Sequence, residues 1–167
     1  MRIVTKAVAA AVAAALCAGS ATAACWTDAA YAAAQVRELD TMLMVQALRC
    51  RKTNANFVEG YNRFVVASRP ALLKANATLK GHFAEEFGER GALNAYDNYM
   101  TTVANRYGAG TVDMDCEDAA ALVEMAAAAK GNAASLQEVA EIAQMTPNLQ
   151  GRRCLGGGSP LTIASRR

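Results

Sequence analysis

The chain has 167 residues, with 17 lysines and arginines, 15 aspartates and glutamates and one histidine. This length accommodates one domain with its own hydrophobic core. Arg2 and Lys6 lie in an N-terminal segment without acidic residues, so the rest of the chain has 17 − 2 = 15 basic and 15 acidic residues. A formally neutral chain lacks the positive charge that binds phosphate backbones, which excludes nucleic acid as an expected partner.

Residues 1–24 have the pattern of a secretion signal. Two positive charges precede an apolar run over residues 7–18, and small residues follow at 21–23. The run is shorter than the roughly 20 residues that span a bilayer, so we predict a cleaved signal peptide. The prediction divides the chain into a signal peptide (1–24), a helical domain (25–154) and a disordered tail (155–167), with no transmembrane span after cleavage and a periplasmic or secreted location.

Four cysteines remain once Cys17 leaves with the signal. An even number of cysteines in an exported protein indicates disulfide bonds. Their separations of 25, 66 and 38 residues include no C-x-x-C pair, so the pattern favours two disulfides over a metal or haem site. The four cysteines are Cys25, Cys50, Cys116 and Cys154.

The first two helical arms are predicted from apolar residues at spacings of three and four. The first arm covers residues 27–51. The second begins at Asn56, where Glu59 completes a capping-box pattern, and runs to about Phe87. Pro70 interrupts it, as one kinked helix or as two short collinear helices; the resumed periodicity favours the kink. The face of the first arm consists of Val36, Leu39, Leu43, Ala47 and Cys50.

A turn at residues 88–91 separates the second arm from the third, which ends at Gly108. Asp115 is a suitable cap for a fourth arm that begins at Cys116. This arm is broken near Gly131, and Ser135 with Glu138 resembles a capping box that opens its last helix.

These elements predict an all-α fold, an up-and-down bundle of four arms stapled by two disulfides. In such a bundle the fourth arm starts where the first one ends, so Cys50 meets Cys116. If the fourth arm travels back along the bundle, Cys154 arrives beside Cys25. This is the one pairing that does not stretch a bridge along the bundle.

The second arm contains one polar cluster with reactive groups. It consists of His82 with Glu85 and Glu86, which follow His82 by three and four residues. It can act as a partial metal ligand set or a general base, but such spacings are ordinary on a solvent-facing helix surface, which is the interpretation we prefer. A single histidine excludes mechanisms with two imidazoles, and the absence of E-x-x-H units excludes a di-iron bundle. We therefore assign no catalytic, cofactor-binding or metal-binding residue.

Two further groups of residues are candidates for binding. The four arginines at positions 152, 153, 166 and 167 are interpreted as a solvated tail in preference to an anion-binding site. Interleaved polar residues would bind a glycan or peptide if they face a groove. These are Asn62, Arg63, Asn94, Asn98, Asn105 and Arg106.

Four short segments carry a resemblance to a family. They are Cys25-Trp26, Leu48-Arg49-Cys50-Arg51, Tyr61-Asn62-Arg63-Phe64-Val65-Val66 and Gly151-Arg152-Arg153-Cys154. With them, most of residues 25–154 resembles small exported four-cysteine proteins of alphaproteobacteria with no established function. The resemblance implies a periplasmic or secreted setting and no catalytic residues.

Three functional hypotheses remain. The leading one is a non-catalytic envelope protein that binds a protein partner or self-assembles through an apolar helical face. The second is a periplasmic chaperone-like stress protein, whose fold loosens when its 15 carboxyl groups titrate at low pH. The third is a carboxylate-dependent hydrolase that uses Glu85 and Glu86, which requires them to line a cleft.

Overall fold

The computed structural model describes residues 25–111 and 113–154, which form four helices and no sheet. Helix α1 spans Asp28–Cys50, α2 spans Val58–Gly108, α3 spans Cys116–Ala128 and α4 spans Ala133–Ile142. The predicted all-α fold is confirmed for this part of the chain. The predicted signal peptide and tail lie outside the described residues. None of the described helices is both long and apolar enough to cross a membrane.

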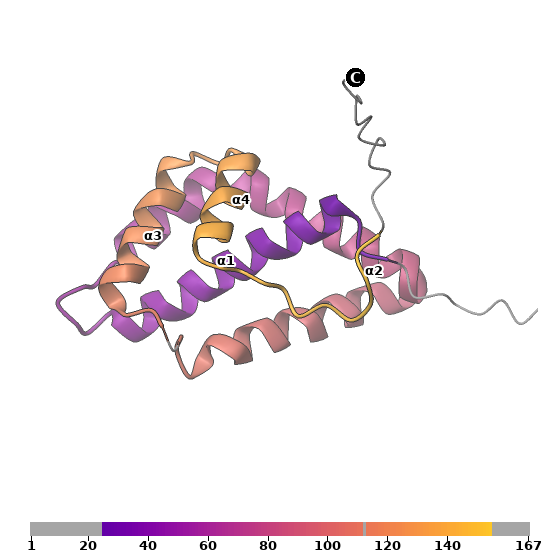
Figure 1. The fold of residues 1–167 in the computed structure, drawn as a ribbon, viewed down its shortest axis with the longest axis horizontal. Helices are drawn as coiled ribbons and strands as arrows, with labels where there is room; N and C mark the ends of the chain where they lie inside the picture. The colour runs from indigo at the N-terminus through magenta and orange to yellow at the C-terminus, as the bar shows by residue number, and fades with distance from the viewer. Residues whose placement is uncertain (1–24, 112, 155–167) are drawn as a thin grey trace, which may run out of the picture.

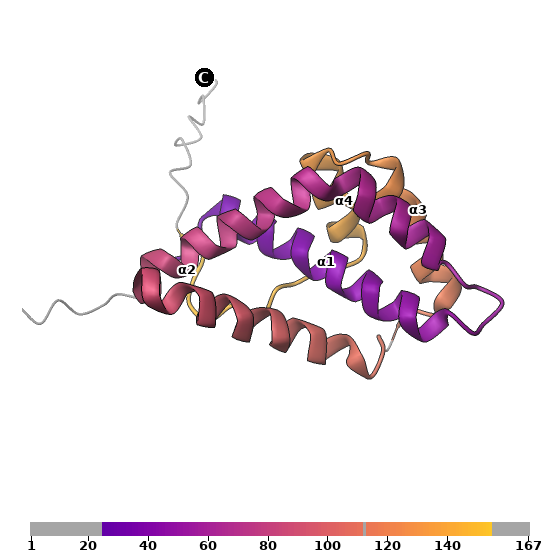
Figure 2. The same cartoon turned by 180° about the vertical axis from the view of Figure 1, so that it is seen from behind.

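Helix α1 runs through the middle of the molecule, and α2, α3 and α4 all pack against it (Figures 1 and 2). It begins as predicted, with the Thr27 hydroxyl accepting a hydrogen bond from the Ala30 amide at 3.1 Å. All five residues of the predicted face are buried. Gln35 and Glu38 lie outside that face and are buried too, because Met145 and the last turn of α2 cover them.

Helix α2 contains the predicted second and third arms. It continues through Pro70, so the second arm is one helix and not two. The one residue with non-helical dihedral angles in α2 is Gly88, with φ 70° and ψ 164°, which a glycine adopts without strain. The chain reverses direction there (Figure 2). The abrupt break therefore lies at the predicted turn between the arms, not at Pro70.

Helices α3 and α4 form a hairpin at one end of the molecule (Figure 1). The break near Gly131 is confirmed: φ there is 76°, and a Cβ would lie 2.7 Å from the Ala67 carbonyl oxygen of α2. Asp115 caps α3 in a capping box. The expected cap at Ser135 is wrong, because Asn132 caps α4 and accepts from the Ser135 amide at 3.0 Å. Because the chain turns at Gly131, the fourth arm folds back on itself as α3 and α4 and does not run along the bundle.

The return to the N-terminus is made by residues 145–154, which contain no helix and which we call the strap. It runs from the end of α4 along the molecule to Trp26 (Figure 1). There the Trp26 amide donates to the Arg152 carbonyl at 2.9 Å, the Cys154 amide donates to the Trp26 carbonyl at 2.8 Å, and the Trp26 indole N–H donates to the Gln150 carbonyl at 2.9 Å.

Both predicted disulfides are present, Cys50–Cys116 and Cys25–Cys154. The first joins the end of α1 to the start of α3. The second joins the strap to the residue before Trp26. A non-helical segment, and not the expected helical arm, brings Cys154 back to Cys25.

Candidate functional site

The predicted polar cluster is not the solvent-facing group that its spacing indicated. His82 is 4% exposed, and its ring centroid lies 3.9 Å from that of Trp26. Its Nε2 is 4.0 Å from a Glu86 carboxylate oxygen, and neither ring nitrogen has a hydrogen-bond partner. Glu85 is exposed. The solvent-facing interpretation is therefore wrong for His82, which supports the tryptophan that holds the strap.

Burial lowers the pKa of His82, against the opposing effect of Glu86 and Glu85. These two carboxylates are the charged groups that face the ring, while Trp26 and Phe83 cover it without charge. A histidine with a lowered pKa binds fewer protons in the folded than in the unfolded state. The free energy of unfolding therefore falls as the pH drops from about 6.5, the unfolded value, toward the folded pKa.

We predict that His82→Leu removes this dependence. The free energy of unfolding of the unsubstituted protein falls relative to that of the variant between pH 7.5 and pH 5.5, because the variant has no ring to protonate. Urea unfolding at both pH values measures the difference. The carboxylates are the same in both proteins, so their contributions to the pH dependence cancel in the comparison. Parallel losses in the two proteins would contradict the assignment.

A second polar cluster, which the sequence did not reveal, lies around Glu38 of α1. Its side chain is fully buried and forms an ion pair with Arg106 at the end of α2. The Tyr107 hydroxyl donates to the same carboxylate oxygen at 2.8 Å, and the other oxygen has no partner. Burial raises the pKa of Glu38, while Tyr107 and Arg106 oppose the rise. The cluster joins α1 to the last turn of α2.

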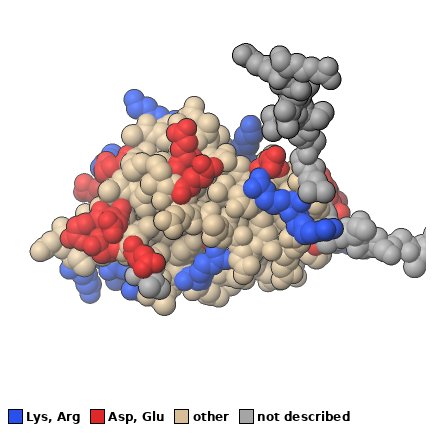
Figure 3. Space-filling view, viewed as in Figure 1, with Lys and Arg blue, Asp and Glu red and all other residues tan. Residues whose placement is uncertain are grey.

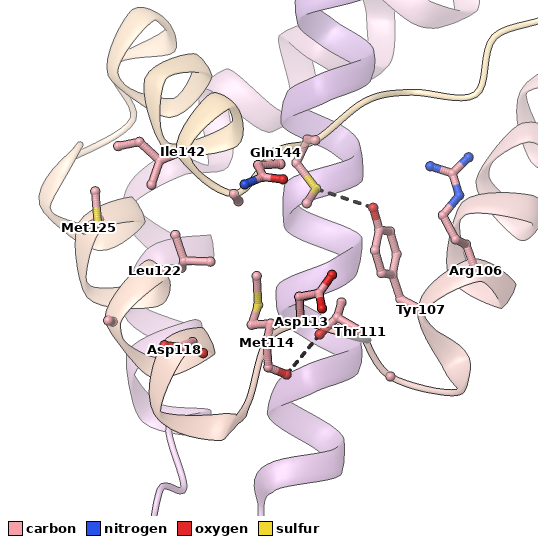
Figure 4. Close-up of a pocket in the computed structure, with 14 residues that line it drawn as sticks. Arg106, Tyr107, Thr111, Asp113, Met114, Asp118, Leu122, Met125, Ile142 and Gln144 are labelled. Carbon is pink, nitrogen blue, oxygen red and sulfur yellow. Dashed lines mark hydrogen bonds between the residues drawn. The ribbon is translucent and has the colours of Figure 1, made fainter.

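An open groove of about 660 Å³ lies beside this cluster. Figure 4 shows α3 and α4 on one side of it, the loop after α2 on the other, and α1 behind. Its apolar lining comes from the loop after α2, from α3, from the end of α4 and from the start of the strap. The Tyr107 hydroxyl, 3.5 Å from the Met145 sulfur, closes one edge. The large apolar residues that line it are Met114, Leu122, Met125, Ile142 and Met145.

Two of these side chains remain exposed, Met125 to 40% and Ile142 to 58%. Methionine is flexible and polarisable, and it is common on surfaces that adapt to different apolar ligands. Asp113 and Asp118 lie beside the apolar lining (Figure 4). The groove therefore offers an adaptable apolar surface next to carboxylates, which can hold a ligand that combines apolar and basic groups.

The charge of the surrounding segment is strongly one-sided. Residues 113–145 contain seven acidic residues and one lysine, a formal charge of 1 − 7 = −6, in a region otherwise rich in alanine. Figure 3 shows acidic side chains gathered over the end of the molecule that holds α3 and α4. Glu124 is neutralised by Arg63 of α2 at 2.5 Å. The acidic residues are Asp113, Asp115, Glu117, Asp118, Glu124, Glu138 and Glu141.

The other candidate residues divide between roles. Of the interleaved polar set, Arg106 lines the groove, whereas Arg63 pairs with Glu124. Arg153 does not belong to a loose tail, because it pairs with Asp28 at 2.6 Å and lies over the Tyr31 ring. Within the described part of the chain, no group of three or more acidic, histidine or cysteine side chains is placed to hold a metal ion.

The fold and groove define a class: an all-α protein with two disulfides and an open, methionine-lined groove. Comparison with known protein families, with curated proteins and with solved structures finds no match to this chain. The functional interpretation therefore depends on the groove itself.

Proposed function

We propose that the protein is a non-catalytic binding protein of the periplasm or the extracellular space, whose groove holds an apolar segment of a partner protein flanked by basic residues. The observation that carries the proposal is the groove, in which exposed Met125 and Ile142 lie beside the carboxylates of Asp113 and Asp118. Its volume is in the range of ligand pockets. The excess of acidic side chains in residues 113–145, which remains after Glu124 pairs with Arg63, favours a cationic partner.

The location is supported by three features. Disulfides form and persist in oxidising compartments, and this chain has two. Residues 1–24 have the charge and hydrophobicity pattern of a signal peptide. The resemblance to small exported four-cysteine proteins of alphaproteobacteria agrees with both.

The proposal is tested with two short synthetic peptides, one alternating leucine with arginine and one alternating leucine with glutamate. Spectra of the protein labelled with ¹³C at its methionine methyl groups report binding. We expect the arginine peptide to shift the resonances of Met114, Met125 and Met145 and to shift that of Met42 much less. The glutamate peptide should produce much smaller shifts at all of these methionines. Absence of any groove-specific shift would contradict the proposal.

Ile142→Asp is the matched disruption. It removes an apolar contact worth about 1.5–3 kcal/mol, so we expect the arginine peptide to bind about tenfold or more weakly. Leu73→Asp is the control, since Leu73 on α2 is also 58% exposed but lies outside the groove. Equal losses of affinity in the two variants would locate binding elsewhere.

A second candidate is the acid-responsive chaperone. The observation in its favour is the buried His82 against Trp26, because protonation of this ring would weaken the packing that holds the strap. A dye that fluoresces on apolar surfaces should then bind more at pH 5.5 than at pH 7.5, with a smaller increase in His82→Leu. The hydrolase has less support, because Glu85 is exposed and neither Glu85 nor Glu86 lines the groove.

A further inference from the structure

The groove is open in the described part of the chain, which ends at Cys154. Thirteen further residues, 155–167, follow Cys154 in the sequence. Two features of residues 155–167 match the chemistry that the groove selects. Leu161 and Ile163 supply apolar side chains, and Arg166 and Arg167 supply positive charge next to them. The same segment contains no acidic residue. Its two arginines are thus complementary to the acidic side chains of residues 113–145, of which Asp113 and Asp118 line the groove.

The length of this segment is sufficient for it to reach the groove. The strap covers the distance from Met145, which lines the groove, to Cys154 in 154 − 145 = 9 residues. Ile163 is also 163 − 154 = 9 residues from Cys154. At about 3.3–3.6 Å per extended residue, both stretches span at most about 32 Å. A tail that runs back beside the strap therefore brings residues 161–167 toward the groove, and Gly156, Gly157 and Gly158 permit the reversal near Cys154.

We propose that residues 161–167 of the same chain occupy the groove when no partner is bound. Leu161 and Ile163 pack against Met125 and Ile142, and the two terminal arginines lie toward Asp113 and Asp118. The inference rests on the proposed function, because the tail acts as a built-in competitor for the partner segment. A partner then binds only the fraction of molecules in which the tail has left the groove.

The first test compares methionine-methyl spectra of the full mature protein with those of Leu161→Ser/Ile163→Ser. We expect the variant to shift the resonances of Met114, Met125 and Met145, and to leave Met42 and Met44 unchanged. Thr162→Ser is the control within the same segment and should leave all of them in place. Identical spectra of variant and unsubstituted protein would overturn the inference.

The second test separates the chain's own tail from that of another copy. Docking within one chain gives groove resonances that do not depend on protein concentration, together with a monomeric mass by light scattering. Concentration-dependent shifts accompanied by a dimeric mass would overturn the proposal in favour of tail exchange between copies. Arg166→Glu/Arg167→Glu should produce the same shifts as the serine variant, because it reverses the charge that faces the acidic rim.

The third test distinguishes failure of this inference from failure of the proposed function. If the tail fills nine of ten molecules, the leucine–arginine peptide binds Leu161→Ser/Ile163→Ser about tenfold more tightly than the unsubstituted protein. Equal affinity of the peptide for both proteins would agree with the proposed binding function and would contradict docking of the tail in the groove. Tail-dependent shifts without binding of the peptide to either protein would agree with docking of the tail and would contradict the proposed binding of a partner segment.

Discussion

Replacement of Cys25 and Cys154 by serine is expected to lower the free energy of unfolding by about 4 kcal/mol. The bridge closes a loop of 129 residues, but the intact Cys50–Cys116 bridge already removes 66 of them, which leaves 129 − 66 = 63. The chain-entropy relation gives about 4 kcal/mol for a loop of that size. Urea unfolding followed by circular dichroism measures the loss, which is a large part of the 5–15 kcal/mol typical of a domain.

Cys50→Ser/Cys116→Ser is the matched control, because a loop of 66 residues gives a similar loss of about 4 kcal/mol. The two variants differ in a local signal. Trp26 is the one tryptophan of the chain and is bonded to the strap. Its native fluorescence should move to longer wavelength only when the Cys25–Cys154 bridge is lost. A loss below about 1 kcal/mol in either variant would contradict the chain-entropy account.

Arg106→Ala is expected to destabilise the protein by about 1–3 kcal/mol at neutral pH, because it leaves the buried Glu38 carboxylate without its ion-pair partner, although Tyr107 still donates to it. Protonation of Glu38 relieves this penalty. The deficit relative to the unsubstituted protein should therefore shrink as the pH falls through the raised pKa of Glu38. Urea unfolding at pH 7.5 and pH 5 measures both effects.

The double variant Glu38→Met/Arg106→Met supplies the control. The double variant removes the buried Glu38 carboxylate together with its partner, and replacement of both members of an ion pair by apolar residues is often close to neutral. The stability of this variant should therefore lie much closer to that of the unsubstituted protein than the stability of Arg106→Ala does. A double variant as unstable as the single one would show that the two side chains act mainly through packing and not through charge.

Prediction of the candidate site from the sequence was partial. Of the residues that line the groove, Arg106 was singled out, as one of the interleaved polar residues. The methionines were not, because Met114, Met125 and Met145 lie on three separate segments and share no local spacing. The acidic residues between 113 and 141 were a signal in the sequence that could have pointed to this end of the molecule, but the net charge of the whole chain conceals it.

His82 shows why burial was misjudged, and Glu38 shows why it was missed. Both lie among charged or polar neighbours, which is typical of a solvated helix surface. His82 became buried because Trp26 packs on it, and Trp26 is held there by a strap more than a hundred residues later in the chain. Glu38 became buried because the end of α2 covers that side of α1. Neither contact leaves a trace in local periodicity.

The sequence by itself determined the helices, the turn at Gly88, the break at Gly131 and the disulfide pairing. These depend on local spacing, on glycine conformation and on the number of arms, which places Cys50 and Cys116 at the same end. Only the tertiary structure decided that α1 is enclosed by its neighbours, that the strap and not a helix carries Cys154 back, and that α3 and α4 form one wall of the groove. Those features depend on how the elements pack together, because the groove side chains come from the end of α2, the loop after it, α3, α4 and the strap.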